Sequence, residues 1–441
     1  MAPHHGFARR LDRRELLRHA GLAGIAVWTT AKSWGGEAPA SPNEKLNLAG
    51  IGVGGQGGWD IGECSSQNIV ALCDVDDRRA AGTYDRFPKA KRFRDYRKML
   101  DAMGREIDAV VIGTPDHSHA LPAVMAMKMG KHCYCEKPLA HCVREVRTMI
   151  EVAKKHKVAT QMGTQIHAGS NYRRVVELVQ SGAIGPVGEV HVWHPVAYGG
   201  GDRPTETPPV PPELDWDLWL GPAPWRPYHP VYVPGAWRSW WDFGTGGLGD
   251  FGCHYMDLPF WALKLRHPTT VEPVEGPRVH PERTSPGLVI RYEFPARGDL
   301  PPVTMTWYDG GKKPGFLAER KVPDWGAAVL FIGQKGMLLA DYGRRQLLPE
   351  AQFAGFRPPE KTIPDSIGHH AEWIRACKTG EPTTCNFDYS GTLAETVLLG
   401  TVAHRVGKKL QWDAENLKAV GCPEADRFIH KTYREGWRLE G

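Results

Sequence analysis

Closely spaced glycines follow an apolar run near the start of the chain. Residues 46–52 are mostly apolar and lead into Gly52-Val53-Gly54-Gly55-Gln56-Gly57. Because glycine has no Cβ, such a loop turns sharply and lets its backbone approach a pyrophosphate. Residues 58–64 can begin a helix whose first amides face the phosphates. The pattern predicts a dinucleotide cradle that comprises Gly52, Gly54, Gln56 and Gly57.

An acidic residue follows the glycine loop at a meaningful distance. Residues 68–73 form a second apolar run, which ends at Asp74, about 20 positions after the first glycine. A carboxylate there accepts hydrogen bonds from ribose hydroxyls and repels a 2′-phosphate. We therefore expect NAD, with NADP left open by Arg78 and Arg79. A glycine-rich hairpin with Asp74 as a helix N-cap is the competing interpretation.

Strand-like and helix-like segments alternate over the next hundred residues, which favours the cofactor site over the hairpin. The expected strands are residues 107–113, 132–135 and 158–163, and the expected helices are residues 94–102, 121–129 and 143–155. This alternation predicts a doubly wound parallel sheet of the Rossmann type. Polar motifs follow the strands, at the edge where such sheets bind ligands.

Four motifs, in this order and spacing, resemble those of the Gfo/Idh/MocA oxidoreductases, named after glucose–fructose oxidoreductase and inositol dehydrogenase. They are Gly52-x-Gly54-x-x-Gly57, Thr114-Pro115-x-x-x-His119, Glu136-Lys137-Pro138 and the segment from Gly246 to His254. The resemblance covers roughly residues 45 to 410. It implies an α/β fold: an N-terminal Rossmann domain, then an α+β domain with an open, mostly antiparallel sheet that carries the substrate site and often the oligomer interface.

The resemblance also assigns residues. It implies a catalytic group of Lys137, Asp250 and His254, and cofactor contacts from Thr114, Pro115, His119, Glu136 and Gln165. We add Lys137 itself and His117 to the expected cofactor site. One departure is the segment from Pro204 to Trp241, which is longer and richer in Pro and Trp than in typical sugar dehydrogenases of the family.

These residue types suit the removal of a hydroxyl proton during hydride transfer. An ammonium at Lys137 would polarise the substrate oxygen, and we expect desolvation and the positive cofactor ring to lower its pKa. Asp250 and His254, at i and i+4, would share one helix face. We expect His254 to be the general base, with Asp250 orienting the substrate or the imidazolium. A metal held by these residues and Asp257 is the alternative; without a dense ligand cluster we expect none.

Tryptophans and prolines gather in residues 204–241. It holds six tryptophans, and nine prolines lie between Pro208 and Pro234, so this segment is predicted to be irregular. Its aromatic rings could stack on sugars while Asp215, Asp217, Arg226 and Arg238 bind hydroxyls. It could equally be a packing arm. We take Trp237 and Arg238, with His167 elsewhere in the chain, as weaker substrate candidates.

The N-terminus resembles an export signal. Arg13-Arg14 is followed by a short apolar stretch, residues 20–30, and by Ala38-Pro39-Ala40, a candidate cleavage site. This favours the twin-arginine route to the periplasm over a basic amphipathic helix. No other segment suggests a membrane span, so we expect a soluble mature protein. The nine scattered cysteines predict buried free thiols.

Length and composition complete the expected organisation. A chain of 441 residues with a net charge of +5 predicts about two domains and no nucleic-acid binding. The expected divisions are a signal peptide (1–40), a Rossmann domain (44–165), a substrate and oligomerisation domain (166–390), and a helix and tail that pack back on the Rossmann domain (391–441). A homo-oligomer, either dimer or tetramer, is expected.

Together these features predict an NAD(P)-dependent oxidoreductase that takes hydride from a secondary alcohol of a carbohydrate or polyol. Since the periplasm has no free dinucleotide pool, the cofactor should be tightly bound and recycled. The alternative is an NAD-dependent glycoside hydrolase, whose transient sugar oxidation leaves no net redox change. A non-catalytic sugar-binding module fits the Lys137, Asp250 and His254 set less well.

Overall fold

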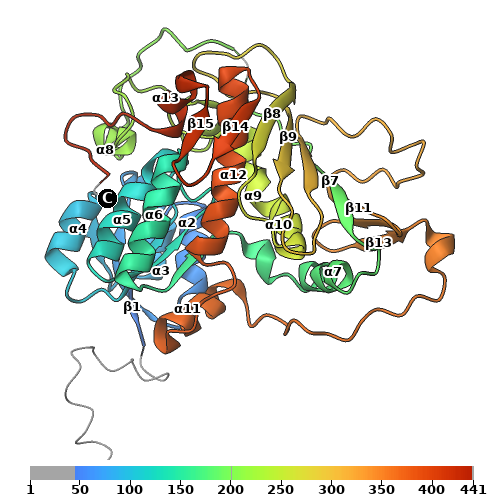
Figure 1. Ribbon diagram of the computed structural model, residues 1–441. Coiled ribbons are helices and arrows are strands. Elements are labelled where there is room, and N and C mark those ends of the chain that lie inside the picture. The colour runs from blue at the N-terminus through green and yellow to red at the C-terminus, as the bar shows by residue number, and fades with distance from the viewer. Residues whose placement is uncertain (1–44, 200, 440–441) are drawn as a thin grey trace, which may run out of the picture. The chain divides into compact units, whose positions relative to one another are not determined.

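The computed structural model describes residues 45–199 and 201–439 (Figure 1). The segment with the predicted twin-arginine signal lies outside the described residues. Among the helices of the described ranges, none is long and apolar enough to cross a membrane.

A six-stranded parallel sheet comes first, with the order β3-β2-β1-β4-β5-β6. Its strands are β1 (Asn47–Ile51), β2 (Asn68–Cys73), β3 (Lys91–Phe93), β4 (Ala109–Ile112), β5 (His132–Cys135) and β6 (Thr160–Met162). The helices between them are α2 (Gln56–Glu63), α3 (Asp77–Arg86), α4 (Tyr96–Met103), α5 (Ala120–Lys128) and α6 (Val143–His156). The strand order reverses at β1 and β4, and this reversal opens the crevice where such sheets bind ligands.

The predicted doubly wound sheet is confirmed, with two elements that the sequence pattern missed. β3 has only three residues, two of them exposed, so no apolar run announces it. α3 is mostly polar and begins because the Asp76 carboxylate accepts hydrogen bonds from the amides of Arg78 and Arg79, both at 3.1 Å.

A nine-stranded sheet follows, with the order β13-β12-β11-β7-β10-β9-β8-β14-β15. Only β7 and β10 pair in parallel, so the predicted mostly antiparallel sheet is confirmed. The strands are β7 (Val187–Trp193), β8 (Thr270–Glu275), β9 (Val289–Phe294), β10 (Val303–Tyr308), β11 (Ala328–Gly333), β12 (Gly336–Ala340), β13 (Arg345–Leu348), β14 (Leu410–Asp413) and β15 (Lys418–Val420). The helices are α7 (Ser170–Gln180), α8 (Trp216–Leu220), α9 (Gly246–Tyr255), α10 (Asp257–Leu263), α11 (His369–Thr379), α12 (Phe387–Val406) and α13 (Asp426–Ile429), with short 3₁₀ turns η1 (Asp116–Ser118), η2 (Gln165–Ala168), η3 (Ala236–Ser239), η4 (Glu350–Phe353) and η5 (Pro423–Ala425).

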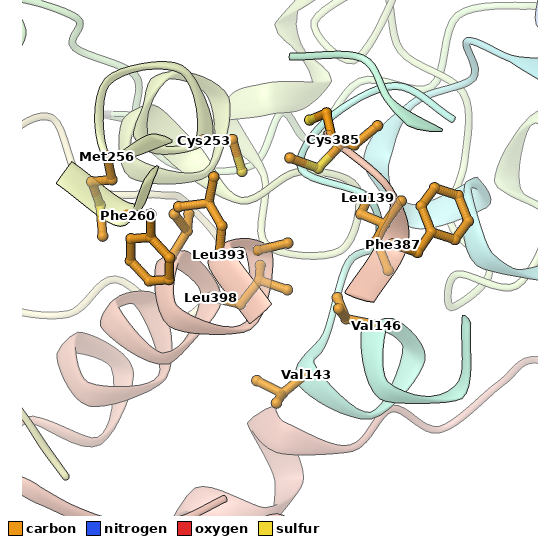
Figure 2. Close-up of a cluster of buried hydrophobic side chains, with 14 of the residues drawn as sticks. Leu139, Val143, Val146, Cys253, Met256, Phe260, Cys385, Phe387, Leu393 and Leu398 are labelled. Atoms are coloured by element: carbon orange, nitrogen blue, oxygen red, sulfur yellow. The ribbon is translucent and has the colours of Figure 1, made fainter. Parts of the chain in front are cut away.

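Helix α12 packs against elements of both sheets. Figure 2 shows Leu393 and Leu398 of α12 near Cys253, Met256 and Phe260, with Val143 and Val146 of α6 on the other side. A helix in contact with α6 and α9 has little exposed surface, which explains its apolar character all round. The tail after α12 was expected to pack back on the Rossmann domain. Its strand β14 instead pairs with β8 and extends the second sheet.

The segment 204–241, expected to be a loop, contains two short helical elements, α8 and the 3₁₀ turn η3. Asp215 caps a short helix, α8, by accepting a hydrogen bond from the Leu218 amide at 3.0 Å. The nine cysteines are all buried free thiols, as their scattered spacing predicted.

Candidate active site

A cleft of about 420 Å³ is lined by residues from both sheets' elements. Its first wall is the glycine loop and the ends of β2, β4 and β5; its second wall comes from the segment before α9 and from α9 itself. The predicted site residues that line it are Gly52, Gly54, Gln56, Asp74, Thr114, Pro115, Glu136, Lys137, Gln165, Trp237, Arg238 and His254.

The glycine loop has the geometry of a dinucleotide cradle. Gly52 has a φ of +73°, and a Cβ on it would lie 2.7 Å from the backbone nitrogen of Thr114. A Cβ on Gly57 would lie 1.9 Å from the Gly52 carbonyl oxygen, so only glycine lets α2 begin this close to β1. No side chain caps α2, which leaves its first amides free for an anion. These residues therefore fit the pyrophosphate of a nicotinamide dinucleotide.

Asp74 supports this loop as well as lining the cleft. Its Oδ2 accepts hydrogen bonds from the amides of Val53 at 2.7 Å and Gly54 at 3.0 Å, while Oδ1 accepts one from Asp76 at 2.9 Å. Asp76 lines the same cleft. Two carboxylates, Asp74 and Asp76, therefore lie where the sequence predicted a single ribose-binding acid. Arg79 lies beside the loop, with its Nη2 2.9 Å from the position of a Cβ on Gly55.

Lys137, which lines the cleft, forms an ion pair with Asp250, which is not among the described residues that line it. Lys137 follows β5, and its Nζ donates to Asp250 Oδ1 on α9. The Tyr198 hydroxyl donates to Asp250 Oδ2 at 2.7 Å, and Arg238 Nε lies 3.2 Å from Oδ1. Three side chains therefore hold Asp250. One of them, Lys137, lies on the predicted cofactor side of the cleft.

The charges around this ion pair change the pKa expected for Lys137. Burial lowers the pKa of Lys137, but the carboxylates of Asp250 and Glu136 outweigh it, so its pKa is raised above the ordinary value. The expected lowering is wrong because it left the carboxylates out: Glu136 is the neighbouring residue in the sequence, and folding brings Asp250 beside the ammonium. Asp250 has a lowered pKa: burial opposes ionisation, and the charges of Lys137 and Arg238 overcome it.

His254 lies on α9 one turn after Asp250, as the spacing predicted, and it lines the cleft. Burial, reinforced by the Lys137 charge, lowers its pKa to about 3. The imidazole is therefore neutral across the physiological range and a weaker base than its ordinary pKa suggested. Its Nδ1 is buried without a hydrogen-bond partner among the described residues.

Three predicted histidines lie behind the cleft wall. His117 is buried, and its ring nitrogens face the carbonyl oxygens of Phe243 and Trp219 at 3.3 and 3.0 Å. His119 contacts the Thr114 carbonyl oxygen at 2.7 Å and so supports that loop. His167 faces the Asp257 carboxylate at 2.9 Å, and neither His117 nor His167 is among the described residues that line the cleft. Contacts with aromatic and polar neighbours hold these histidine side chains in the protein interior.

The tryptophan-rich segment is mainly a packing arm. Its buried rings form a cluster of their own, in which Trp216 stacks on Trp219 with centroids 4.8 Å apart. Trp225 is the exception, with 67% of its surface exposed. Arg226 is buried and pairs with Asp242. Arg238 remains at the cleft, with its guanidinium 4.2 Å from the Trp237 ring.

Sequence reasoning missed several residues at the cleft. Asp116 follows β4, lines the cleft and accepts a hydrogen bond from the Thr245 hydroxyl at 2.7 Å. Burial raises its pKa to about 7. Its place at a strand end was a usable signal. Trp437 carried none, because it comes from a distant segment that only folding brings to the cleft. Tyr198 carried none either, and it reaches the site through its hydrogen bond to Asp250.

Models of one protein family match both parts of the chain. Residues 46–164 match the NAD-binding Rossmann fold of the oxidoreductase family, and residues 169–298 match its C-terminal alpha/beta domain. Together the two matches cover more than half of the chain.

Individual proteins are similar over shorter stretches. The inositol 2-dehydrogenase of Salmonella paratyphi B is 29% identical over 154 residues, 34% of this chain and 45% of that protein. A glycosyl hydrolase family 109 protein of Shewanella pealeana is 26% identical over 283 residues, 56% of each chain. The chain thus spans about half the length of the curated relatives it matches. The solved WlbA dehydrogenase from Bordetella pertussis, in complex with NADH and UDP-GlcNAcA, shares the fold at 17% identity, with a TM-score of 0.59 over 84% of this chain and 99% of that one.

Proposed function

This chain belongs to the Gfo/Idh/MocA oxidoreductase family with an NAD-binding Rossmann domain, and we propose that it transfers hydride between a secondary alcohol of a carbohydrate or polyol and NAD. The observation that carries this proposal is the Lys137–Asp250 ion pair, which lies at the same cleft as the glycine loop. The inositol dehydrogenase relative supports a polyhydroxylated substrate.

In the proposed reaction, the bound dinucleotide supplies or accepts the hydride. Lys137 holds a proton at Nζ and donates it to the substrate oxygen when a carbonyl is reduced. Asp250 keeps the ammonium ionised and in place, and Arg238 and Tyr198 hold Asp250. His254, as a neutral imidazole, accepts a hydrogen bond from a neighbouring hydroxyl. In the oxidative direction Lys137 must first lose its proton, so oxidation gains rate as the pH rises.

A second candidate is the NAD-dependent glycoside hydrolase, in which the sugar is oxidised, the aglycone eliminated, water added and the sugar reduced again. Two observations favour it. The relative matched over the longer stretch is a glycosyl hydrolase family 109 protein. Asp116, whose pKa of about 7 lets it hold a proton at the cleft, could protonate the leaving group.

The proposal extends to location and cofactor use. Residues 1–40 carry the twin-arginine pattern, so we place the mature protein in the periplasm. Because that compartment offers no dinucleotide pool, the cofactor stays bound and each turnover regenerates it. Asp74 and Asp76 at the cleft favour NAD over NADP. We also propose a homo-oligomer, dimer or tetramer.

The test is to purify the exported protein, denature it and measure the released dinucleotide. Near-stoichiometric NAD(H) supports the resident cofactor; an empty protein that needs added millimolar NAD would refute it. The purified protein is then incubated with aryl glycosides and no added cofactor. Release of the aryl alcohol selects the hydrolase, whereas oxidation of one sugar coupled to reduction of another selects the oxidoreductase.

A further inference from the structure

A cluster of polar side chains extends from the cleft wall, where Glu136 and Gln165 lie, into the interior, and the reaction above assigns it no proton. Its centre is the carboxyl pair, which consists of Asp60 on α2 and Glu136 after β5. Both side chains are buried, at 0% and 5% exposure. Gln165 of η2 and His370 of α11 complete the surroundings, so four elements far apart in the sequence meet here.

One amide nitrogen reaches both members of the carboxyl pair. Gln165 Nε2 lies 2.6 Å from Glu136 Oε1 and 3.5 Å from Asp60 Oδ1. His370 Nε2 faces the same Asp60 oxygen at 2.9 Å. Glu136 folds back over Gly163, where a Cβ would lie 2.1 Å from its Oε1. Glycine at this position therefore lets the two carboxyls approach each other.

The hydrogen bonds around the pair leave one carboxyl oxygen without a donor, so the two carboxyls can share one proton. Asp60 Oδ1 has four polar neighbours, whereas the buried Oδ2 has no donor among the described residues. Two buried carboxylates this close cannot both ionise readily. Burial raises the pKa of Asp60 to about 7 and that of Glu136 well above its ordinary value.

The other titratable groups that face the pair do not change charge near neutrality. Burial raises the pKa values of Tyr134, Cys64 and Cys135 far above neutral, and lowers that of His370. Lys137 stays an ammonium because its pKa is raised. Glu63 is exposed on α2. Among the groups that face one another here, the carboxyl pair is therefore the one whose charge varies around pH 7. Asp116, whose pKa is also about 7, lies elsewhere at the cleft, next to Thr245.

We propose that Asp60 and Glu136 share one proton and that the charge of this pair sets the balance between oxidised and reduced bound cofactor. The inference rests on the proposed function, because it requires the nicotinamide to react beside Lys137, next to Glu136. The oxidised ring carries one more positive charge than the reduced ring. A second negative charge on the pair, present once the shared proton leaves, therefore favours the oxidised form.

The experiment uses the holoenzyme with its own cofactor. It is equilibrated with a redox mediator at fixed potential, at about pH 6 and about pH 8.5, on either side of the expected titration. The reduced fraction is read from the near-ultraviolet absorbance of reduced nicotinamide and expressed relative to the free NAD couple at the same pH. The variants are Asp60→Asn and, as the matched control, Asp101→Asn, which changes an exposed acid on α4.

In the wild type and in Asp101→Asn, the bound ratio of oxidised to reduced cofactor should rise about tenfold or more between these pH values. In Asp60→Asn the rise should be clearly smaller than in the wild type, since the pair has lost one carboxyl and can no longer gain a second negative charge. Unchanged pH dependence in Asp60→Asn overturns the proposal.

Should Asp60→Asn fail to fold, infrared difference spectra of Asp116→Asn give the answer, because that variant lacks the other cleft carboxyl with a pKa of about 7. A protonated carboxyl band must disappear as the pH rises through about 7, and its absence overturns the proposal. A protein without bound NAD(H) contradicts the proposed function. A protein whose bound NAD(H) ignores pH contradicts only the shared proton.

Discussion

Lys137 and Asp250 are 113 positions apart in the sequence, yet their side chains form one ion pair at the cleft. Lys137 is fixed by the end of β5 in the first sheet, and Asp250 by α9, which packs against α12. The pair therefore exists only when both parts of the fold are assembled. This dependence makes the ion pair the first target for mutation.

Replacing Lys137 with alanine should abolish turnover and leave the cofactor bound. The variant loses the proton donor, while the glycine loop that holds the dinucleotide is untouched, so we expect kcat to fall by about 10²–10⁴-fold. The measurement is kcat together with the NAD(H) released on denaturation. Lys98→Ala, at an exposed position on α4, is the control. Near-normal kcat in Lys137→Ala would remove Lys137 from the catalytic group.

Replacing Gly57 with alanine should disturb the cofactor cradle. The new Cβ would meet the Gly52 carbonyl oxygen at 1.9 Å, so β1 and α2 must separate. We expect a loss of about 1–3 kcal/mol in the free energy of unfolding and a loss of bound NAD(H). Gly82→Ala is the matched control, since nothing lies within 4 Å of its Cβ. That exposed helical site should gain about 0.5–1 kcal/mol. Equal melting temperatures for both variants would contradict this packing.

Replacing Asp116 with asparagine should stabilise the protein progressively as the pH rises above about 4. Burial raises the folded pKa of this carboxyl to about 7, so its contribution to stability is complete below the unfolded value near 3.9 and is lost as the pH rises toward 7. Asparagine resembles the protonated carboxyl and does not ionise, so the variant does not lose this stability as the pH rises. Relative to wild type, the variant should gain about 1.4 kcal/mol per pH unit across that window.

The check is a pair of thermal unfolding curves at about pH 4.5 and about pH 8, on either side of most of that window. Asp101→Asn serves as the exposed control. A constant difference between Asp116→Asn and wild type at both pH values would show that Asp116 does not titrate as proposed.

The tryptophan-rich segment offers a test of packing against ligand binding. Trp240 is fully buried, and its loss as Trp240→Ala should cost about 3–5 kcal/mol of unfolding free energy. Trp225 is 67% exposed, and Trp225→Ala should change stability by less than about 0.5 kcal/mol. Chemical denaturation of both variants measures these values. If Trp225→Ala instead raises KM for a sugar while folding normally, the arm also binds substrate.

The sequence by itself determined the first sheet and the cofactor loop. Strand-end motifs repeat along one continuous stretch, so local periodicity was enough to place β1, β2, β4, β5 and β6. Glycine is required at positions 52 and 57 because a Cβ at either position would clash with backbone atoms. The four-residue spacing of Asp250 and His254 placed both on α9, because helical geometry is local.

Only the tertiary structure decided how those residues are charged and which of them reach the cleft. Desolvation and the nearest charges come from segments that are remote in sequence, so the raised pKa of Lys137 and the lowered pKa of His254 could not be foreseen. Packing also turned His117 and His167 inward and brought Trp437 to the cleft. Residue type and spacing fix what chemistry is available, whereas burial and long-range contacts decide which protons each group holds.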